Sequence, residues 1–462
     1  MKYRSVNHIH FVGIGGIGMS GIAELLINLG FSVTGSDLAD SAIIQHLRSC
    51  GATIHRGHSS DNIGDCEVLV YSSAVKRDNP ELIAAEQRGI PIIRRAEMLG
   101  ELIAVKETSI GVAGTHGKTS TSSMLGAVLF EANMDPTLVI GGLVKKLDTN
   151  SVLGSGDIIV VEADEYDRSF LALNPTMSII TNIELEHTDI YQDLEDIQKA
   201  FIQYGNSSPF YGRVVACIDS PGVQSILAAL KRPITTYGFS QQADFKAKDL
   251  EFNEYSSSFQ VISPEKALGE ISLHVPGTHN VLNALSVVAL TTEMGIPFPT
   301  IQKGLSAYGG VRRRFEMKGL VHDIMVIDDY AHHPTEVKAT LKAARNGWDR
   351  RIITVFQPHL YSRTRDFHTE FASAFMDSDI FIVTDIYPAR EEPIPGVSGK
   401  LVADAGRRSG HRNAHFIPDF AGVQDLLDDI LKEGDMVITI GAGSIWRFSE
   451  QLVQHLQETY DA

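Results

Sequence analysis

Short apolar runs recur along the chain, and most of them end in a glycine-rich or polar turn. Four of these runs lie at residues 8–12, 110–113, 157–162 and 177–180. Strands that are covered on both faces of a sheet have near-continuous apolar sequence, so we interpret each run as a buried strand. Helical patterns follow the first two runs, with apolar residues three and four positions apart. Strands that alternate with helices predict an α/β protein with largely parallel sheets.

The last third of the chain repeats this alternation most regularly. Strands are predicted near 324–328, 352–357, 380–385, 414–417 and 435–440. Helices are predicted between them, for example at 336–345, 367–376 and 422–431. The stretch from about 240 to 275 differs, because apolar and polar residues alternate singly there, which indicates antiparallel strands. We expect three domains: a Rossmann-like domain (1–106), a central P-loop-type ATPase domain with a mixed sheet (107–315), and a second Rossmann-like domain (316–462).

A glycine-rich turn joins the first predicted strand to the first helix. Gly13, Gly15 and Gly18 have the spacing of a dinucleotide fingerprint, and Asp37 ends the next predicted strand. One interpretation is therefore the binding of a nicotinamide cofactor. The pattern itself specifies less, namely a diphosphate at a helix N-terminus and a ribose hydroxyl on the acid. Any nucleoside diphosphate derivative would satisfy it.

A second glycine-rich turn, Gly114-Thr-His-Gly-Lys-Thr-Ser120, links a strand to a helix in the centre of the chain. Backbone N–H groups of such a turn can surround phosphates, Lys118 can reach their oxygens, and the Thr119 hydroxyl can bind Mg²⁺. The turn is shorter than the usual phosphate loop, because Val112 stands where a glycine is expected. The alternative is an ordinary glycine-rich turn with an exposed lysine.

Polar residues follow the next two apolar runs. Glu162 lies directly at a strand end, where nucleotide-hydrolysing enzymes hold Mg²⁺. We interpret the following acids, Asp164, Glu165 and Asp167, as a solvated loop. His187 follows another strand beside two acids, and is either a metal or substrate ligand or a structural histidine.

Two further groups of polar residues have a functional and a structural interpretation. Asn280 and Asn283 lie about one helical turn apart and could pair with an adenine edge, or could only cap the helix and line its surface. Arg312, Arg313 and Arg314 form a positive patch that could hold phosphate, or an ordinary charged linker.

Composition limits the classes of function. The chain has 462 residues and a formal net charge of −17, which disfavours nucleic-acid binding. Its three cysteines fit neither a disulfide framework nor a zinc motif, so we expect them to be small buried residues. The chain contains neither an apolar run as long as the roughly 18 residues of a membrane span nor a leader-like N-terminus, so we expect a cytoplasmic protein without membrane insertion.

Taken together, these motifs resemble the Mur ligases of bacterial cell-wall synthesis over nearly the whole chain. The resemblance is carried by residues 13–20, 114–119, 162–165, 181–187, 277–283, 314–316, 329–334, 356–359 and 385–393. The first and last of these segments suggest the branch that joins L-alanine to UDP-N-acetylmuramate. The resemblance thus implies an ATP-dependent ligase that acts through an acyl phosphate, with UDP-N-acetylmuramate, L-alanine and ATP as its ligands, and a protein that is a monomer or a dimer.

The resemblance also implies residue roles. The UDP-sugar would contact Gly15, Gly16, Gly18, Met19, Asp37, His58 and Ser73. ATP would contact Gly114, Thr115, His116, Gly117, Lys118, Thr119, Ser120, His279, Asn280, Asn283, Arg314 and Asp329. Mg²⁺, which Mn²⁺ could replace, would bind Thr119, Glu162 and His187. The amino acid would meet Tyr330, His332, Arg363 and Arg390, under a third domain that closes over ATP. Catalysis would rest on Lys118, Glu162, His187, Arg314 and His332.

The sequence departs from the family pattern at a few positions. Many relatives have a carbamylated lysine downstream of the histidine, but residues 201–207 contain no lysine, although Lys199 is near. Leu360 and Ser444 stand where arginine and aspartate are frequent. Three other functions compete with the ligase: a recycling ligase that attaches a whole tripeptide, a nicotinamide-dependent oxidoreductase, and a nucleotide switch without catalysis.

Overall fold

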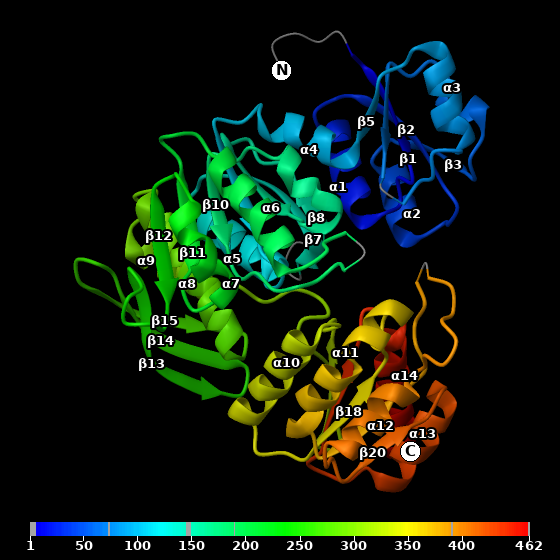
Figure 1. The fold of residues 1–462 in the computed structure, drawn as a ribbon, viewed down its shortest axis with the longest axis vertical. Coiled ribbons are helices and arrows are strands. Elements are labelled where there is room, and N and C mark those ends of the chain that lie inside the picture. Colours follow the sequence, from blue (N-terminus) through cyan, green and yellow to red (C-terminus); the bar gives the residue numbers. More distant parts are fainter. Residues whose placement is uncertain (1–5, 73, 145–148, 189, 390, 461–462) are drawn as a thin grey trace. The chain divides into compact units, whose positions relative to one another are not determined.

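The computed structural model describes residues 6–460 apart from 73, 145–148, 189 and 390. Three sheets follow one another along the chain, and helices separate most of their strands (Figure 1). The expectations for Ser73 and Arg390 lie outside the described residues. The chain folds into two compact units. Unit 1 comprises residues 1–249, 259–272 and 282–309, and unit 2 comprises residues 250–258, 273–281 and 310–462.

The first sheet has five strands in the order β3-β2-β1-β4-β5. Its strands are β1 (His8–Val12), β2 (Ser32–Asp37), β3 (Thr53–Arg56), β4 (Val68–Tyr71) and β5 (Ile92–Arg94). Its helices are α1 (Ile17–Asn28), α2 (Ala42–Ser49), α3 (Pro80–Arg88) and α4 (Arg95–Ile103). All neighbouring strands are parallel, so the carboxyl ends of β1 and β2 meet at one edge beside the first glycine turn. The expected Rossmann-like arrangement is confirmed.

The second sheet has ten strands in the order β15-β14-β13-β12-β11-β10-β6-β9-β7-β8. They are β6 (Thr108–Ala113), β7 (Thr137–Val144), β8 (Thr149–Val152), β9 (Ile158–Ala163), β10 (Met177–Ile180), β11 (Arg213–Cys217), β12 (Ile234–Gly238), β13 (Phe245–Asn253), β14 (Ser256–Ile262) and β15 (Ala267–Leu273). Its helices are α5 (Lys118–Glu131), α6 (Leu194–Ser207), α7 (Pro221–Ile226), α8 (Thr278–Glu293) and α9 (Phe298–Ser306). Strands β6, β9 and β10 are parallel neighbours, whereas β7 and β8 are antiparallel, so the sheet is mixed as expected.

The third sheet has six strands in the order β16-β17-β21-β18-β19-β20. They are β16 (Glu316–Val321), β17 (Ile324–Asp329), β18 (Ile352–Phe356), β19 (Ile380–Val383), β20 (Ala414–Phe416) and β21 (Met436–Ile440). Its helices are α10 (Pro334–Gly347), α11 (Tyr361–Ala374), α12 (Lys400–Arg408), α13 (Phe420–Ile430) and α14 (Ile445–Tyr460). The five expected strands are present and parallel. The sequence pattern did not predict β16, an antiparallel edge strand in which polar and apolar residues are mixed.

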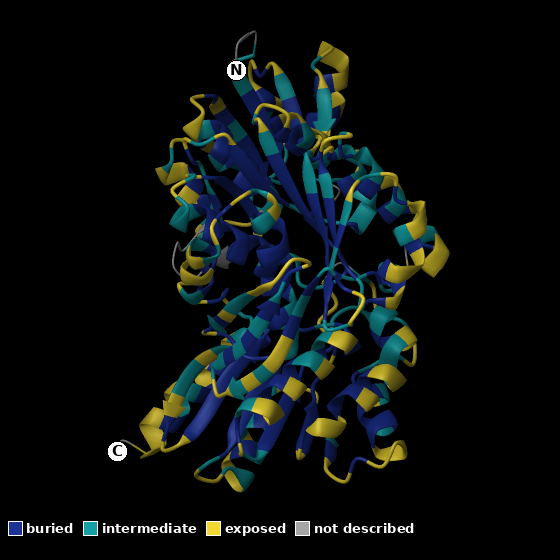
Figure 2. Ribbon diagram, turned by 90° about the vertical axis from the view of Figure 1, so that its left-hand side faces the viewer, coloured by how far each residue is buried: buried dark blue, intermediate teal, exposed yellow. Residues whose placement is uncertain are grey.

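Short 3₁₀ helices complete the described secondary structure: η1 (Ser60–Ile63), η2 (Tyr166–Ala172), η3 (Leu227–Ala229) and η4 (Phe375–Asp377). The central strands form the cores, and every residue of β17, β18 and β21 is buried. Figure 2 shows the same contrast, with buried strands and helices that expose their outer faces. Because these parallel strands are buried on both faces, they appear in the sequence as apolar runs that can be recognised without the structure. The domain boundaries near 106 and 315 stay predictions.

Candidate functional site

The turn between β6 and α5 depends on two glycines. Gly114 has a φ of 139° and Gly117 a φ of 84°, both in the region that favours glycine. A Cβ atom on Gly114 would lie 2.0 Å from the Thr181 hydroxyl oxygen at the end of β10. The turn therefore approaches the neighbouring strand too closely for any side chain. It brings the backbone to the N-terminus of α5, the position where backbone N–H groups bind anions.

Lys118 lies inside this turn rather than on the surface. Its Nζ atom donates to the carbonyl oxygens of Gly114 (2.6 Å) and Thr115 (3.2 Å) and to Glu165 Oε2 (2.7 Å). Burial lowers the pKa of Lys118, but the nearby carboxylates of Glu165 and Asp164 outweigh burial and raise the pKa above its ordinary value. The lysine is therefore a fixed positive charge at the turn, as phosphate binding requires.

Glu165 is fully buried, so the interpretation of this acid as part of a solvated loop was wrong. Its side chain is the ion-pair partner of Lys118, and its backbone carbonyl accepts a hydrogen bond from the Tyr191 hydroxyl at 2.7 Å. The sequence pattern did not show this, because an acid two residues after the end of a strand is usually exposed. Glu165 lies near Lys118 because β9, which precedes Glu165, pairs with β6, which precedes the turn that contains Lys118.

The side chains of Thr119, in α5, and Glu162, in β9, face each other. The Thr119 hydroxyl donates to Glu162 Oε2 at 3.2 Å, and the Gly141 N–H donates to Glu162 Oε1 at 2.7 Å. Burial raises the pKa of Glu162 above its ordinary value, although these two hydrogen bonds and Lys118 lower it. Oxygen ligands from a hydroxyl and a carboxylate are those that Mg²⁺ prefers. The expected pairing of Thr119 with Glu162 is therefore present.

His187 belongs to a separate group of possible metal ligands, together with Asp164 and Glu165. One ligand atom from each of these residues lies within 4.8 Å of the others. His187 Nε2 is 3.6 Å from Glu165 Oε1, a buried oxygen with no hydrogen-bond partner in the described part of the chain. Burial lowers the pKa of His187, but Glu165 and the neighbouring acids raise it overall. An unsatisfied buried carboxylate oxygen fits a cation, so this group and Glu162 form two candidate metal positions.

Lys199, which is near the position of the relatives' carbamylated lysine, and the two asparagines of α8 lie in different surroundings. Lys199 is exposed and pairs with Glu195 at 2.7 Å on α6, so it does not take part in these two groups. Asn283 is buried, and its Oδ1 atom would lie 2.7 Å from a Cβ atom on Gly117. The surface interpretation of Asn283 was therefore wrong, because this amide is buried and faces the turn between β6 and α5. Asn280 is also buried, and its Nδ2 atom donates to the Pro276 carbonyl at 2.8 Å.

The first glycine turn is held by Asp37. Its Oδ2 atom accepts from the Gly15 N–H at 2.8 Å, and its Oδ1 atom accepts from the Ala39 N–H at 3.0 Å. Gly16 is the N-terminal cap residue of α1, and Met19 is buried in the first turn of that helix. A Cβ atom on Gly18 would lie 2.7 Å from a guanidinium nitrogen of Arg95, so a cation lies beside the helix N-terminus.

This cation is part of a cluster that the sequence pattern did not predict. A cavity of about 250 Å³ has four arginines in its lining: Arg77, Arg94, Arg95 and Arg168. Val75, which lines the same cavity, would also lie 3.4 Å from a Cβ atom on Gly13. The cavity therefore adjoins the first glycine turn, and its four arginines outnumber its two acids, Glu97 and Asp167, in a chain whose net charge is −17. Only the dipeptide Arg94-Arg95, at the junction of β5 and α4, could have indicated it.

His58 lies in a buried polar network rather than alone. Its Nδ1 atom is 2.9 Å from the Ser36 hydroxyl and 3.4 Å from Glu81 Oε2, and Ser36 donates to that oxygen at 2.6 Å. Asn62 donates to Glu81 Oε1 at 2.6 Å. Burial raises the pKa of Glu81, but hydrogen bonds from His10, Ser36 and Asn62 lower it to about 2. His58 thus contacts the buried Glu81 carboxylate and Ser36, the next-to-last residue of β2.

In unit 2, polar side chains gather after β17 and β18. The rings of Tyr330 and His332 lie 5.3 Å apart, and the rings of His332 and His359 lie 6.1 Å apart. Arg363 Nη1 is 3.3 Å from His359 Nδ1. The structure therefore brings Tyr330, His332 and Arg363 together, as expected. It adds His359, which belongs to a motif of the family resemblance but had no expected role.

The remaining expected residues of unit 2 lie near Glu336. Arg314 Nη1 is 3.5 Å from Glu336 Oε1, and its guanidinium lies 5.4 Å from the centre of the Tyr330 ring. Burial and Arg314 lower the pKa of His279 to about 4, so His279 is neutral near pH 7. Asp329 accepts from the N–H groups of Phe315 and Ala331, both at 2.8 Å, and burial raises the pKa of its carboxyl to about 6.

The comparison with protein families identifies the class. Three family descriptions match successive parts of the chain: Mur ligase family, catalytic domain (8–107), Mur ligase middle domain (112–291), and Mur ligase, glutamate ligase domain (313–443). The chain therefore belongs to the Mur ligase family, which confirms the resemblance seen in the sequence. The family assignment also removes the support for a nicotinamide-dependent oxidoreductase.

Two relatives and two solved structures show which members of the family this chain resembles. UDP-N-acetylmuramate–L-alanine ligase of Geotalea uraniireducens is 50% identical over 455 residues, with 98% of this chain and 99% of that protein covered. The enzyme of the same name from Salinibacter ruber is 50% identical over 454 residues, at 98% and 95% coverage. The crystal structure of the UDP-N-acetylmuramate-alanine ligase of Thermotoga maritima aligns with a TM-score of 0.83 at 29% identity, at 98% and 99% coverage. A murein peptide ligase from Psychrobacter arcticus aligns with a TM-score of 0.71 at 25% identity, at 97% and 98% coverage. Among the described residues, no helix is long and apolar enough to cross a membrane.

Proposed function

We propose that the protein joins L-alanine to the lactyl carboxylate of UDP-N-acetylmuramate, with hydrolysis of ATP to ADP and phosphate, as a step of peptidoglycan precursor synthesis in the cytoplasm. The observation that carries the proposal is identity at half of all aligned positions, over nearly the full length, with ligases of that name. Nucleic acid and membrane have no part in this reaction. We expect the active protein to be a monomer or a dimer.

The first glycine turn and the arginine cavity suit the diphosphate of the sugar nucleotide. The N-terminus of α1 is the end of a helix that favours anions, and Arg95 places a guanidinium beside Gly18. Asp37 already accepts the Gly15 N–H of this turn with one carboxylate oxygen, and its other oxygen accepts the Ala39 N–H. We therefore propose Gly15, Gly16, Gly18 and Arg95 as the diphosphate contacts, and assign Asp37 first to the shape of the turn.

The second glycine turn suits the triphosphate of ATP. Lys118 provides a fixed cation, and the N-terminus of α5 provides N–H groups for phosphate oxygens. Thr119 and Glu162 would hold Mg²⁺, and Asp164, Glu165 and His187 would hold a second divalent ion, with Mn²⁺ as a substitute. Bound Mg²⁺ would neutralise charge on the phosphate oxygens.

Phosphorylation of the lactyl carboxylate would give its carbonyl carbon a good leaving group. A carboxylate cannot expel oxide when an amine attacks it, whereas an acyl phosphate expels phosphate. Lys118 and Arg314 would balance the charge of the phosphoryl group during its transfer. The neutral amine of L-alanine would then attack the carbonyl carbon, and the tetrahedral intermediate would release phosphate and leave the amide.

The group after β17 and β18 suits the amino acid. Tyr330, His332, His359 and Arg363 combine aromatic rings with one guanidinium, which could meet a carboxylate. Selection of alanine would then be steric. One extra methylene in a pocket costs about 1–3 kcal/mol of discrimination, so we expect some acceptance of serine and glycine.

The test is ADP release measured with and without UDP-N-acetylmuramate, across a panel that contains L-alanine, L-serine, glycine and the wall tripeptide. We expect release that requires the UDP-sugar and is fastest with L-alanine; a preference for the tripeptide would refute the proposal in favour of the recycling ligase. Lys118→Ala should abolish release while UDP-sugar binding persists. Lys199→Ala is the matched control, because this exposed lysine pairs with Glu195 on α6 and belongs to neither candidate metal position.

A further inference from the structure

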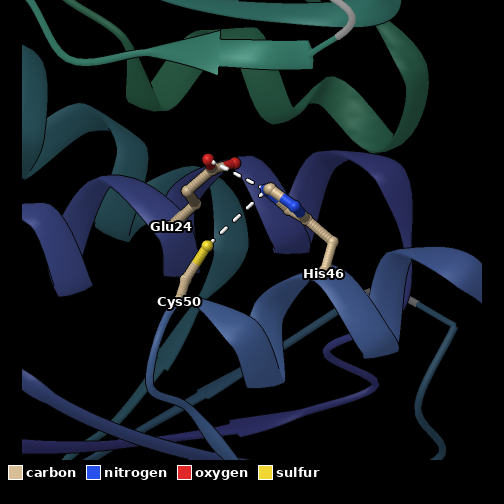
Figure 3. Close-up of side chains that lie close together, drawn as sticks. All are labelled: Glu24, His46 and Cys50. Atoms are coloured by element: carbon tan, nitrogen blue, oxygen red, sulfur yellow. Dashed lines mark hydrogen bonds and ion pairs between the residues drawn. The ribbon is translucent and has the colours of Figure 1, made fainter.

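A group of three different metal-ligand types lies between the first two helices. Glu24 comes from α1, His46 from α2, and Cys50 follows α2 as its C-terminal cap residue (Figure 3). His46 and Cys50 are four residues apart, so their side chains lie on one face of the helix. The Cys50 N–H donates to the His46 carbonyl at 3.0 Å, which continues the helical geometry to the cysteine. None of the three has a role in the proposed ligase reaction.

The two distances from His46 to the other ligand atoms are close to those of a tetrahedral zinc site. His46 Nε2 is 3.1 Å from Glu24 Oε1 and 3.6 Å from Cys50 Sγ. Zinc bonds of about 2.0–2.1 Å to nitrogen and oxygen and about 2.3 Å to sulfur put N and O roughly 3.4 Å apart and N and S roughly 3.6 Å apart. All three ligand atoms lie within 4.8 Å of one another. An ion could therefore enter the group with small side-chain adjustments.

The surroundings also suit a bound cation. The second oxygen of Glu24 accepts from the Ser151 hydroxyl at 2.8 Å, which orients the carboxylate as outer hydrogen bonds do around metal ligands. The His46 side chain is 53% exposed, which leaves room for water as a fourth ligand and a path for the ion.

We propose that Glu24, His46 and Cys50 bind a borderline-soft divalent cation of the zinc type, with one position left to water. A thiolate and an imidazole beside a single carboxylate favour such an ion over Mg²⁺ or Ca²⁺, which prefer several oxygen ligands. The ion would join α1, which begins at the first glycine turn, to α2, which follows the strand that carries Asp37. Occupancy would therefore stabilise the two helices that flank the proposed diphosphate site.

The first test is spectroscopic and uses the full chain after removal of metals with a chelator. Co²⁺ is added in the presence of excess Mg²⁺, which fills sites that prefer oxygen ligands. We expect one equivalent of Co²⁺ to give a thiolate-to-cobalt charge-transfer band, which Zn²⁺ then abolishes. A wild-type protein without this band overturns the proposal, and no variant is needed for that result.

Variants then identify the ligands. Cys50→Ser should lose the charge-transfer band, while Cys66→Ser, which alters a buried thiol outside the group, should keep it. His46→Gln should weaken Zn²⁺ binding more than about 100-fold, and Ser151→Ala should weaken it about 10-fold through the carboxylate it orients. Zn²⁺ should raise the melting temperature of the wild type and not that of His46→Gln. A band that persists in Cys50→Ser, or that disappears in Cys66→Ser, contradicts the assignment.

Discussion

The ion pair between Lys118 and Glu165 offers a quantitative test of what stabilises the turn between β6 and α5. The chain contains a matched pair, because Lys118–Glu165 and Lys199–Glu195 both have an N–O distance of 2.7 Å. Glu165 is fully buried and its lysine is 15% exposed, whereas Glu195 and its lysine are 73% and 67% exposed. The two pairs therefore differ in burial and not in contact distance.

Glu165→Gln removes the charge and keeps the shape of the side chain, so no cavity is created. Loss of one partner of a buried ion pair costs about 3–5 kcal/mol, because the other charge is left without compensation. Asp164 and Glu186 also act on Lys118, so we expect a loss near the lower end, about 3 kcal/mol. Glu195→Gln should cost about 0.2–1 kcal/mol, as exposed pairs do.

The assay is native-state hydrogen exchange of peptides from β6, β9 and β10, which reports local free energies of opening. A loss of about 3 kcal/mol corresponds to roughly 150-fold faster exchange. The loss should also depend on pH. Without Glu165, the pKa of buried Lys118 lies closer to neutrality, so the penalty is complete at low pH and shrinks as pH rises toward the ordinary lysine pKa of about 10.4. Equal effects of the two substitutions, or a loss that grows with pH, would refute the reasoning.

Three further substitutions test other parts of the molecule. Gly114→Ala should abolish ATP turnover, because its φ is 139° and its Cβ has no space, while Gly309→Ala, with nothing within 4 Å, should leave kcat unchanged. Arg95→Ala should raise KM for the UDP-sugar about 10- to 100-fold at nearly constant kcat, since a charge-assisted contact contributes about 1.5–3 kcal/mol. The control is Arg412→Ala, which changes an exposed arginine. An equal change of KM in both variants would count against the diphosphate assignment. Acid unfolding should begin in the first sheet, because the lowered pKa of Glu81, about 2, contributes stability above pH 4.5 that is lost as pH falls toward 2. Thermal melts should show that Glu81→Gln lacks this part of the pH dependence, and an unchanged profile would exclude the Glu81 network as its source.

The sequence predicted the sheets well, for a physical reason. Strands such as β17 and β18 are buried on both faces, so most of their residues are apolar and the run is visible without other information. The edge strand β16 was missed because its residues Glu316–Val321 are only partly buried and mix polar with apolar side chains. Strand order was not readable either, since the contact of β6 with both β9 and β10 joins segments far apart in the chain.

The candidate site was predictable where a local pattern carries the chemistry. The turn from Gly114 to Ser120 follows from a strand, a turn and a helix that are consecutive in the sequence, and Glu162 follows from its place at the end of an apolar run. Glu165 and Arg95 were missed because their roles depend on partners from other segments, namely Lys118 and Gly18. A residue whose function arises from a distant contact leaves no periodic signal.

Comparison of the two glycine turns explains why the first motif was ambiguous. Both turns place a strand end against a helix N-terminus, and each is held by one charged side chain. At the first turn the charge is the carboxylate of Asp37, which accepts backbone N–H groups, and the cation is Arg95 from another segment. At the second turn the cation Lys118 is part of the motif and donates to turn carbonyls. Under the proposed assignments, the second motif contains the cation that faces the phosphates, whereas the cation at the first turn comes from outside the motif. The glycines of the first turn alone therefore fit nicotinamide and uridine nucleotides equally well.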